Sequence, residues 1–167
     1  MPWLQRELEL RGFKVFQPEM PDTDNPKINT WVNHLTKVIG SPNGSTYFVG
    51  GSIGCQTIMR YLETIDSKVG DVIFVAGWFN LANLEGHEEE EIARSWIETP
   101  IDFEKVKKNT RSITVLISDD EPYNYVEENK KTFEEKLGAK VILEHGKGHF
   151  TSEDGITEIP QILEILK

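Results

Sequence analysis

The segment Thr46–Gly54 reads Thr-Tyr-Phe-Val-Gly-Gly-Ser-Ile-Gly and passes from a β-prone run into a turn rich in glycine. Apolar residues then recur at helical spacing, at Ile58, Tyr61, Leu62 and Ile65. A β-branched and aromatic run predicts a strand, and apolar positions three and four apart predict one buried face of a helix. The segment therefore predicts a strand, a tight turn and a helix in direct succession.

The same alternation of strands and helices extends in both directions. Short apolar runs predict further strands at 13–16, 72–75, 113–117 and 141–143, with helical patterns at 3–11, 31–39, 103–108, 126–137 and near 162–166. The strand runs are continuously apolar, as expected for a parallel sheet that helices cover on both faces. We therefore predict one three-layer α/β domain over residues 1–167, with a mostly parallel sheet of about five strands.

The net charge and the cysteine count limit the kinds of partner and the cellular compartment that we expect. The chain of 167 residues carries 18 Lys and Arg against 28 Asp and Glu, a formal net charge of −10. This charge repels nucleic acid and anionic membranes, so we expect neither as a partner. A single cysteine, Cys55, suits a reducing compartment, and the first residues lack the pattern of a signal peptide. These features predict a cytoplasmic protein.

Gly50-Gly51-Ser52-Ile53-Gly54 is a G-x-S-x-G motif at a strand-to-helix junction, the context of a nucleophile elbow. In such a turn Ser52 lies in strained backbone geometry, and glycine is expected two residues to either side, where a Cβ would clash. The backbone N–H of Ile53 would then donate to an oxyanion. The alternatives are an ordinary glycine-rich turn and a phosphate-binding loop, and the glycine spacing fits neither known phosphate motif.

An elbow requires a base and an orienting acid, which follow the serine in the order acid and then histidine. Asp119 and Asp120 come directly after the predicted strand 113–117, and His149 follows the strand 141–143. Either aspartate could instead cap a helix or form a turn, a role that suits Asp119. His145 competes with His149, but its position directly after the strand indicates a structural role.

Other reactive residues favour less specific interpretations. Cys55 at the start of a helix suits a small buried side chain better than a second nucleophile. No H-E-x-x-H or helical H-x-x-x-H pattern is present, so we expect no metal.

Aromatic residues follow two predicted strands at the edge where ligands of such sheets bind. Trp78 and Phe79 follow the strand 72–75, and Tyr123 and Tyr125 follow Asp120. They predict an apolar pocket for a small acyl substrate. The alternative is that these rings only pack beneath the helices.

The chain resembles small α/β-hydrolases of the retinoblastoma-binding serine hydrolase type. The matching stretches cover nearly the whole chain: Pro18-Glu19-Met20-Pro21-Asp22, the helix near Trp31, the elbow, Met59-Arg60-Tyr61, Ser118-Asp119-Asp120 and Gly148-His149-Phe150. The resemblance implies Ser52 as nucleophile, Asp120 rather than Asp119 as the acid and His149 as the base. It also implies hydrolysis of esters or amides with no metal or cofactor.

Two departures from the family bear on activity. Members usually carry histidine where this chain has Gly51. They also begin with a strand and a His-Gly-x-Gly loop that supplies a second oxyanion donor, and this chain starts at the helix that follows them. One lost donor typically costs about 10²–10³ in rate, so we expect a weak hydrolase. An incomplete sheet would also favour self-association.

The leading hypothesis is therefore hydrolysis of a carboxylic ester, or of a related thioester or amide, through an acyl-enzyme on Ser52. One alternative is a weak or inactive binding protein on the same fold, because fold alone does not fix function. Another is a flavodoxin-like binder of small molecules, which would leave the order of serine, acid and histidine as a coincidence.

Overall fold

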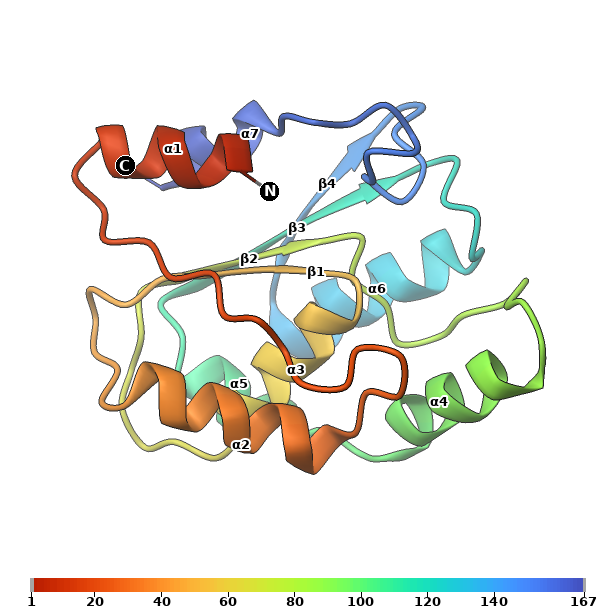
Figure 1. Ribbon diagram of the computed structural model, residues 1–167, viewed down its shortest axis with the longest axis horizontal. Helices are drawn as coiled ribbons and strands as arrows, with labels where there is room; N and C mark the ends of the chain where they lie inside the picture. Colours follow the sequence, from red (N-terminus) through yellow and green to blue (C-terminus); the bar gives the residue numbers. More distant parts are fainter. Residues whose placement is uncertain (1, 167) are drawn as a thin grey trace.

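The computed structural model describes residues 2–166, and a parallel sheet lies at its centre (Figure 1). Within these residues the sheet has four strands, in the order β1-β2-β3-β4. They are β1 (Phe48–Gly51), β2 (Asp71–Val75), β3 (Ser112–Ser118) and β4 (Lys140–Glu144). All neighbouring pairs are parallel, so the carboxyl ends of the strands meet at one edge. That edge carries the residues that the sequence singled out.

Both faces of the sheet are buried, which explains the continuous apolar runs. In β2, Val72 and Phe74 pack into one core, while Ile73 and Val75 pack into the other. Because successive side chains of a strand point to opposite faces, a strand covered on both sides must be apolar at every position. The two cores thus confirm the three-layer architecture.

Helices cover the two faces unequally (Figure 1). On one side lie α1 (Pro2–Leu10) and α7 (Pro160–Ile165), which contribute Leu8, Ile162 and Leu163 to their core. On the other side lie α2 (Ile28–Ile39), α3 (Ile53–Leu62), α5 (Phe103–Lys108) and α6 (Val126–Leu137). The remaining helix is α4 (His87–Glu98), whose buried Trp96 packs against Trp31 of α2.

The predicted strand at 13–16 is wrong. Phe13 and Val15 do point into the core beside α1 and α7, and Phe16 is 66% exposed, so the side chains alternate as they would in a strand. Among the described residues, however, no strand pairs with this segment, and an extended chain without a neighbour forms no ladder. The sheet therefore has four strands rather than five, and β1 is an edge strand.

Buried polar side chains of α3 bind backbone oxygens at the end of α4 and in the loop after β2. The guanidinium of Arg60, only 2% exposed, donates to the backbone oxygens of Trp96 at 2.6 Å and Thr99 at 2.8 Å. These carbonyls lie at the end of α4, where backbone acceptors have no partner within the helix. One turn earlier, the side chain of Gln56 donates to the backbone oxygen of Trp78 at 2.6 Å. This hydrogen bond ties the loop after β2 to α3.

Candidate active site

Ser52 lies in the sharp turn between β1 and α3, with φ 49° and ψ −122°. This positive φ is costly for a residue with a side chain and persists only where the surroundings enforce it. The enforcing contact is the hydrogen bond from the Ser52 N–H to the Val75 backbone oxygen, at 2.9 Å. Ile53 is the first residue of α3, so its N–H has no partner within the helix. The turn has the geometry of a nucleophile elbow.

The three glycines of the elbow are not equivalent. A Cβ on Gly50 would lie 2.6 Å from Ile58 Cδ1 and 3.0 Å from the backbone of Gly54, so glycine is required there. A Cβ on Gly54 would meet nothing within 4 Å among the described residues, so the expected clash at that position is wrong. At Gly51 the nearest atom would be 4.0 Å away, which leaves room for a side chain. Of the three glycines, Gly50 is the one at which a side chain would clash with the described residues, those of the helix that follows.

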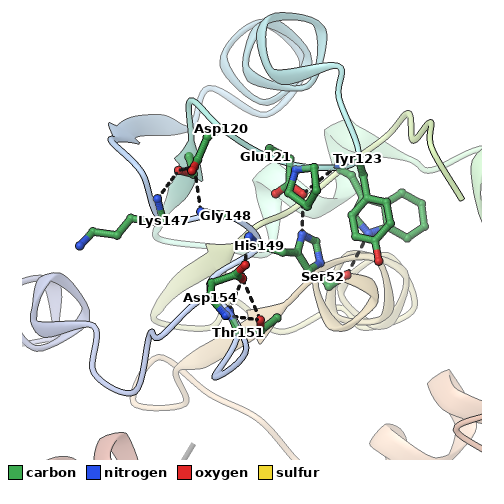
Figure 2. Close-up of polar contacts among 12 residues, drawn as sticks. Ser52, Asp120, Glu121, Tyr123, Lys147, Gly148, His149, Thr151 and Asp154 are labelled. Atoms are coloured by element: carbon green, nitrogen blue, oxygen red, sulfur yellow. Dashed lines mark hydrogen bonds and ion pairs between the residues drawn. The ribbon is translucent and has the colours of Figure 1, made fainter.

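His149 lies in the loop after β4 and pairs with a buried carboxylate (Figure 2). Its Nδ1 is 2.7 Å from Oε1 of Glu121, and the two side chains are 14% and 8% exposed. The ring of Tyr123 meets the imidazole edge to face, with centroids 5.0 Å apart. Burial raises the pKa of Tyr123, and nearby carboxylates, Glu89 first, raise it further. The histidine is thus held between a carboxylate and an aromatic ring.

Asp120 does not pair with His149, contrary to the expectation from the sequence. Its Oδ1 accepts hydrogen bonds from Ser118 Oγ at 2.5 Å and from the Gly148 N–H at 2.8 Å. These donors, Ser118 first, lower the pKa of Asp120. The physical reason is the turn after β3, which leaves Asp120 exposed and buries the Glu121 side chain, whose Oε1 accepts from the Tyr123 N–H at 3.4 Å. In the structure the carboxylate that contacts the imidazole is therefore Glu121, one residue after the aspartate that the sequence favoured.

His145 and Asp119 form a second, exposed pair beside the first. Nδ1 of His145 is 2.6 Å from Oδ2 of Asp119, and the other oxygen of Asp119 accepts from the Gly146 N–H at 3.0 Å. The hydrogen bond from His145 lowers the pKa of Asp119, and Asp119 raises the pKa of His145. His145 and Asp119 thus join the two loops at an exposed position.

Trp78 brings the elbow and the histidine loop together. Its indole N–H donates to Ser52 Oγ at 3.3 Å, and Trp78 also lines a cavity of about 10 Å³ with Glu121 and His149. Figure 2 shows the imidazole between the Glu121 carboxylate and Ser52. Within the described residues, Ser52 Oγ has its hydrogen bond with Trp78 and none with His149.

The other two residues of the predicted pocket lie apart from Ser52. The ring of Phe79 packs 4.5 Å from the Phe133 ring and 5.5 Å from the Phe103 ring, so it belongs to the core. Tyr125 is 40% exposed at the start of α6. The structure therefore brings Trp78 and Tyr123 to the site and gives Phe79 the packing role.

Cys55 is fully buried, and its thiol donates to the backbone oxygen of Gly50 at 3.2 Å. Burial raises its pKa to about 12, which suits a packed side chain rather than a nucleophile. In the part of the chain that the structure describes, no three His, Cys, Asp or Glu side chains gather to hold a metal. Nor does any helix in residues 2–166 combine the length and hydropathy needed to cross a membrane.

Glu121 and the polar end of Trp78 are the features that sequence reasoning missed. The run Asp119-Asp120-Glu121 offers three adjacent carboxylates, and the direction of each depends on the turn that follows the strand. One signal was available, because Pro122 restricts the backbone of the residue before it. The hydrogen bond from Trp78 to Ser52 could not be predicted from the sequence, because it depends on how the ends of β1 and β2 lie side by side.

A parallel sheet with a serine elbow, then a carboxylate loop and then a histidine loop is the arrangement of an α/β-hydrolase. The chain belongs to the serine hydrolase family, whose sequence model matches residues 1–167. The resemblance found in the sequence is thereby confirmed, and the chain is an enzyme of the hydrolase class.

Relatives support both the family and the fold. The chain is 26% identical to YdeN of Bacillus subtilis (strain 168) over 172 residues, which cover 99% of this chain and 85% of YdeN. It is also 26% identical to the serine hydrolase RBBP9 of Rattus norvegicus over 166 residues, covering 99% and 83%.

Solved structures give the same fold at lower identity. The crystal structure of the ydeN gene product superposes with a TM-score of 0.88 at 23% identity, over 99% of this chain and 87% of that one. A carboxylesterase of the thaumarchaeon Nitrososphaera gargenis gives a TM-score of 0.65 at 12% identity, over 98% and 82%. At these identities the likeness concerns the fold.

Proposed function

We propose that the chain hydrolyses carboxylic esters, or related thioesters and amides, through an acyl-enzyme on Ser52. The observation that carries the proposal is the strained backbone of Ser52 at the junction of β1 and α3. Strain of this kind is retained where a side chain must stand clear of the sheet. A solved structure with the same fold is named as a carboxylesterase, which favours the ester class.

In the first half of the reaction, Nε2 of His149 takes the proton of Ser52 Oγ as the oxygen attacks the carbonyl carbon. The tetrahedral oxyanion accepts a hydrogen bond from the Ile53 N–H at the positive end of α3. His149 then gives its proton to the leaving alkoxide, and the acyl group stays on Ser52. In the second half, water loses a proton to His149 and attacks the acyl carbonyl; as the bond to Ser52 Oγ breaks, His149 gives that proton to Oγ, which releases the acid and restores Ser52.

Covalent labelling tests the nucleophile directly. A fluorophosphonate probe should label the protein, and Ser52→Ala should abolish the labelling and lower hydrolysis of p-nitrophenyl acetate by about 10⁴-fold or more. Ser45→Ala is the matched control, because Ser45 is exposed in a turn before β1. Labelling that persists in Ser52→Ala would overturn the assignment. No labelling and no turnover in the wild type would favour a binding protein on this fold.

A further inference from the structure

Two loops at the catalytic edge are joined residue by residue. The last residue of β3 is Ser118, the loop after it presents Asp119, Asp120 and Glu121, and the loop after β4 presents residues 145–149. Asp119 binds His145 and Gly146, Ser118 Oγ accepts from the Lys147 N–H at 2.8 Å, Asp120 accepts from Gly148, and Glu121 pairs with His149. Among these contacts, the pair of Glu121 and His149 is the one in which a carboxylate binds the ring of the candidate base.

An ionised carboxylate has no proton to donate, so its partner nitrogen must carry one. The 2.7 Å contact with Glu121 therefore selects the tautomer of His149 with a proton on Nδ1 and a lone pair on Nε2. That is the tautomer a general base needs toward serine. At 8% and 14% exposure, the Glu121–His149 hydrogen bond is strengthened by the low local dielectric.

Asp120 is occupied elsewhere. Its hydrogen bonds with Ser118 and the Gly148 N–H tie one loop to the other and leave the imidazole untouched. The carboxylate is exposed, so water screens any charge interaction that reaches beyond these contacts. Asp120 thus fixes the path of the backbone that carries His149.

We infer that Glu121 is the positioning carboxylate of His149, and that Asp120, the residue favoured by the sequence, holds the loop instead. The inference rests on the proposed function for its catalytic meaning and on the contacts above for its geometry. Its chemistry moves no proton to Glu121: the carboxylate stays ionised and stabilises the imidazolium while His149 holds the serine proton.

The test compares two isosteric substitutions at adjacent residues. Glu121→Gln should lower kcat for p-nitrophenyl acetate by about 10²–10⁴-fold with little change in KM, because an amide no longer selects the productive tautomer. Asp120→Asn should stay within about threefold of wild type, since its amide oxygen still accepts from Gly148. Glu121→Asp, one methylene shorter, should recover part of the loss.

Proton NMR supplies a readout that is independent of turnover. The wild type should show a low-field imidazole Nδ1–H resonance that disappears in His149→Ala and in Glu121→Gln and persists in Asp120→Asn. The opposite pattern in the two carboxylate variants would overturn the inference. If the wild type proves inactive, the proposed function fails, and the resonance still decides which carboxylate binds His149. Circular dichroism and Glu121→Asp cover the case in which Glu121→Gln fails to fold.

Discussion

Two histidine–carboxylate pairs lie side by side in the same two loops, and they differ in burial far more than in geometry. The nitrogen–oxygen distances are 2.7 Å for His149 and Glu121 and 2.6 Å for His145 and Asp119. The side chains are 14% and 8% exposed in the first pair, but 83% and 42% exposed in the second. The distance between two groups therefore does not reveal which pair can do chemistry.

Exposure to water weakens the electrostatic attraction in the second pair more than in the first. An exposed ion pair is screened and contributes little, whereas a buried one keeps most of its Coulomb attraction. Burial also holds the imidazole in one orientation, here beneath the ring of Tyr123. The exposed pair instead joins its two loops, with help from the bond between Asp119 and the Gly146 N–H. We interpret the first pair as the catalytic couple and the second as a latch.

Replacing each histidine by alanine tests this contrast with the largest expected effect. His149→Ala should lower kcat/KM for p-nitrophenyl acetate by about 10⁴–10⁶-fold, because the base is lost. His145→Ala should stay within about twofold, as is usual for an exposed side chain. Steady-state kinetics on both variants, with circular dichroism as the folding control, decide the matter. A large loss in His145→Ala would refute the division of roles.

Two glycines that flank Lys147 provide a test of intermediate size. Both have positive φ, 52° at Gly148 and 63° at Gly146. A Cβ on Gly148 would overlap the Asp154 carboxylate, which accepts the His149 N–H at 3.0 Å, whereas a Cβ on Gly146 would meet no atom of residues 2–166 within 4 Å.

Gly146→Ala should therefore cost only the strain of the left-handed backbone, about 1–2 kcal/mol of unfolding free energy, with activity retained. Gly148→Ala should destabilise more and lower kcat by about 10²-fold, because a shift of roughly 1 Å at a catalytic group is enough for such a loss. Urea unfolding and kinetics on the same preparations measure both. Equal activity in the two variants would show that Asp154 does not position His149.

The smallest expected effect is a pH dependence of stability that comes from the latch. Asp119 raises the pKa of His145 above its ordinary 6.5, so the contribution of His145 is complete below about 6.5 and is lost as pH rises through the higher folded value. The pKa of Asp119 is lowered from 3.8, so its contribution is lost only as pH falls through that lower value. Between about pH 3.8 and pH 6.5, the ordinary pKa values of the two groups, both contributions to stability are complete.

Melting temperatures of the wild type and of His145→Gln should therefore differ more at about pH 5.5 than at about pH 9. Asp119→Asn should give the same profile, because it removes the same pair. A difference between wild type and variant that is independent of pH would mean that the latch acts through packing and not through charge.

The elbow could be predicted because its signal is local. Gly50 and Ser52 stand in a fixed spacing, and the close contacts at Gly50 are with residues 54–58 of the helix that follows directly. The segment 13–16 could not be predicted in the same way. Its side chains alternate correctly, yet a strand exists only where another strand supplies hydrogen bonds, and no strand of the described residues pairs with this segment.

The sequence by itself determined the three-layer architecture, the position of Ser52 and the loops that carry the acid and the histidine. These follow from periodicity and from turn chemistry, which act over a few residues. Only the tertiary structure showed that Glu121 rather than Asp120 contacts the His149 imidazole, and that this pair is buried while His145 is exposed. Their relative burial depends on how the ends of β3 and β4 meet and on where Tyr123 packs, and such contacts join residues that lie far apart along the chain.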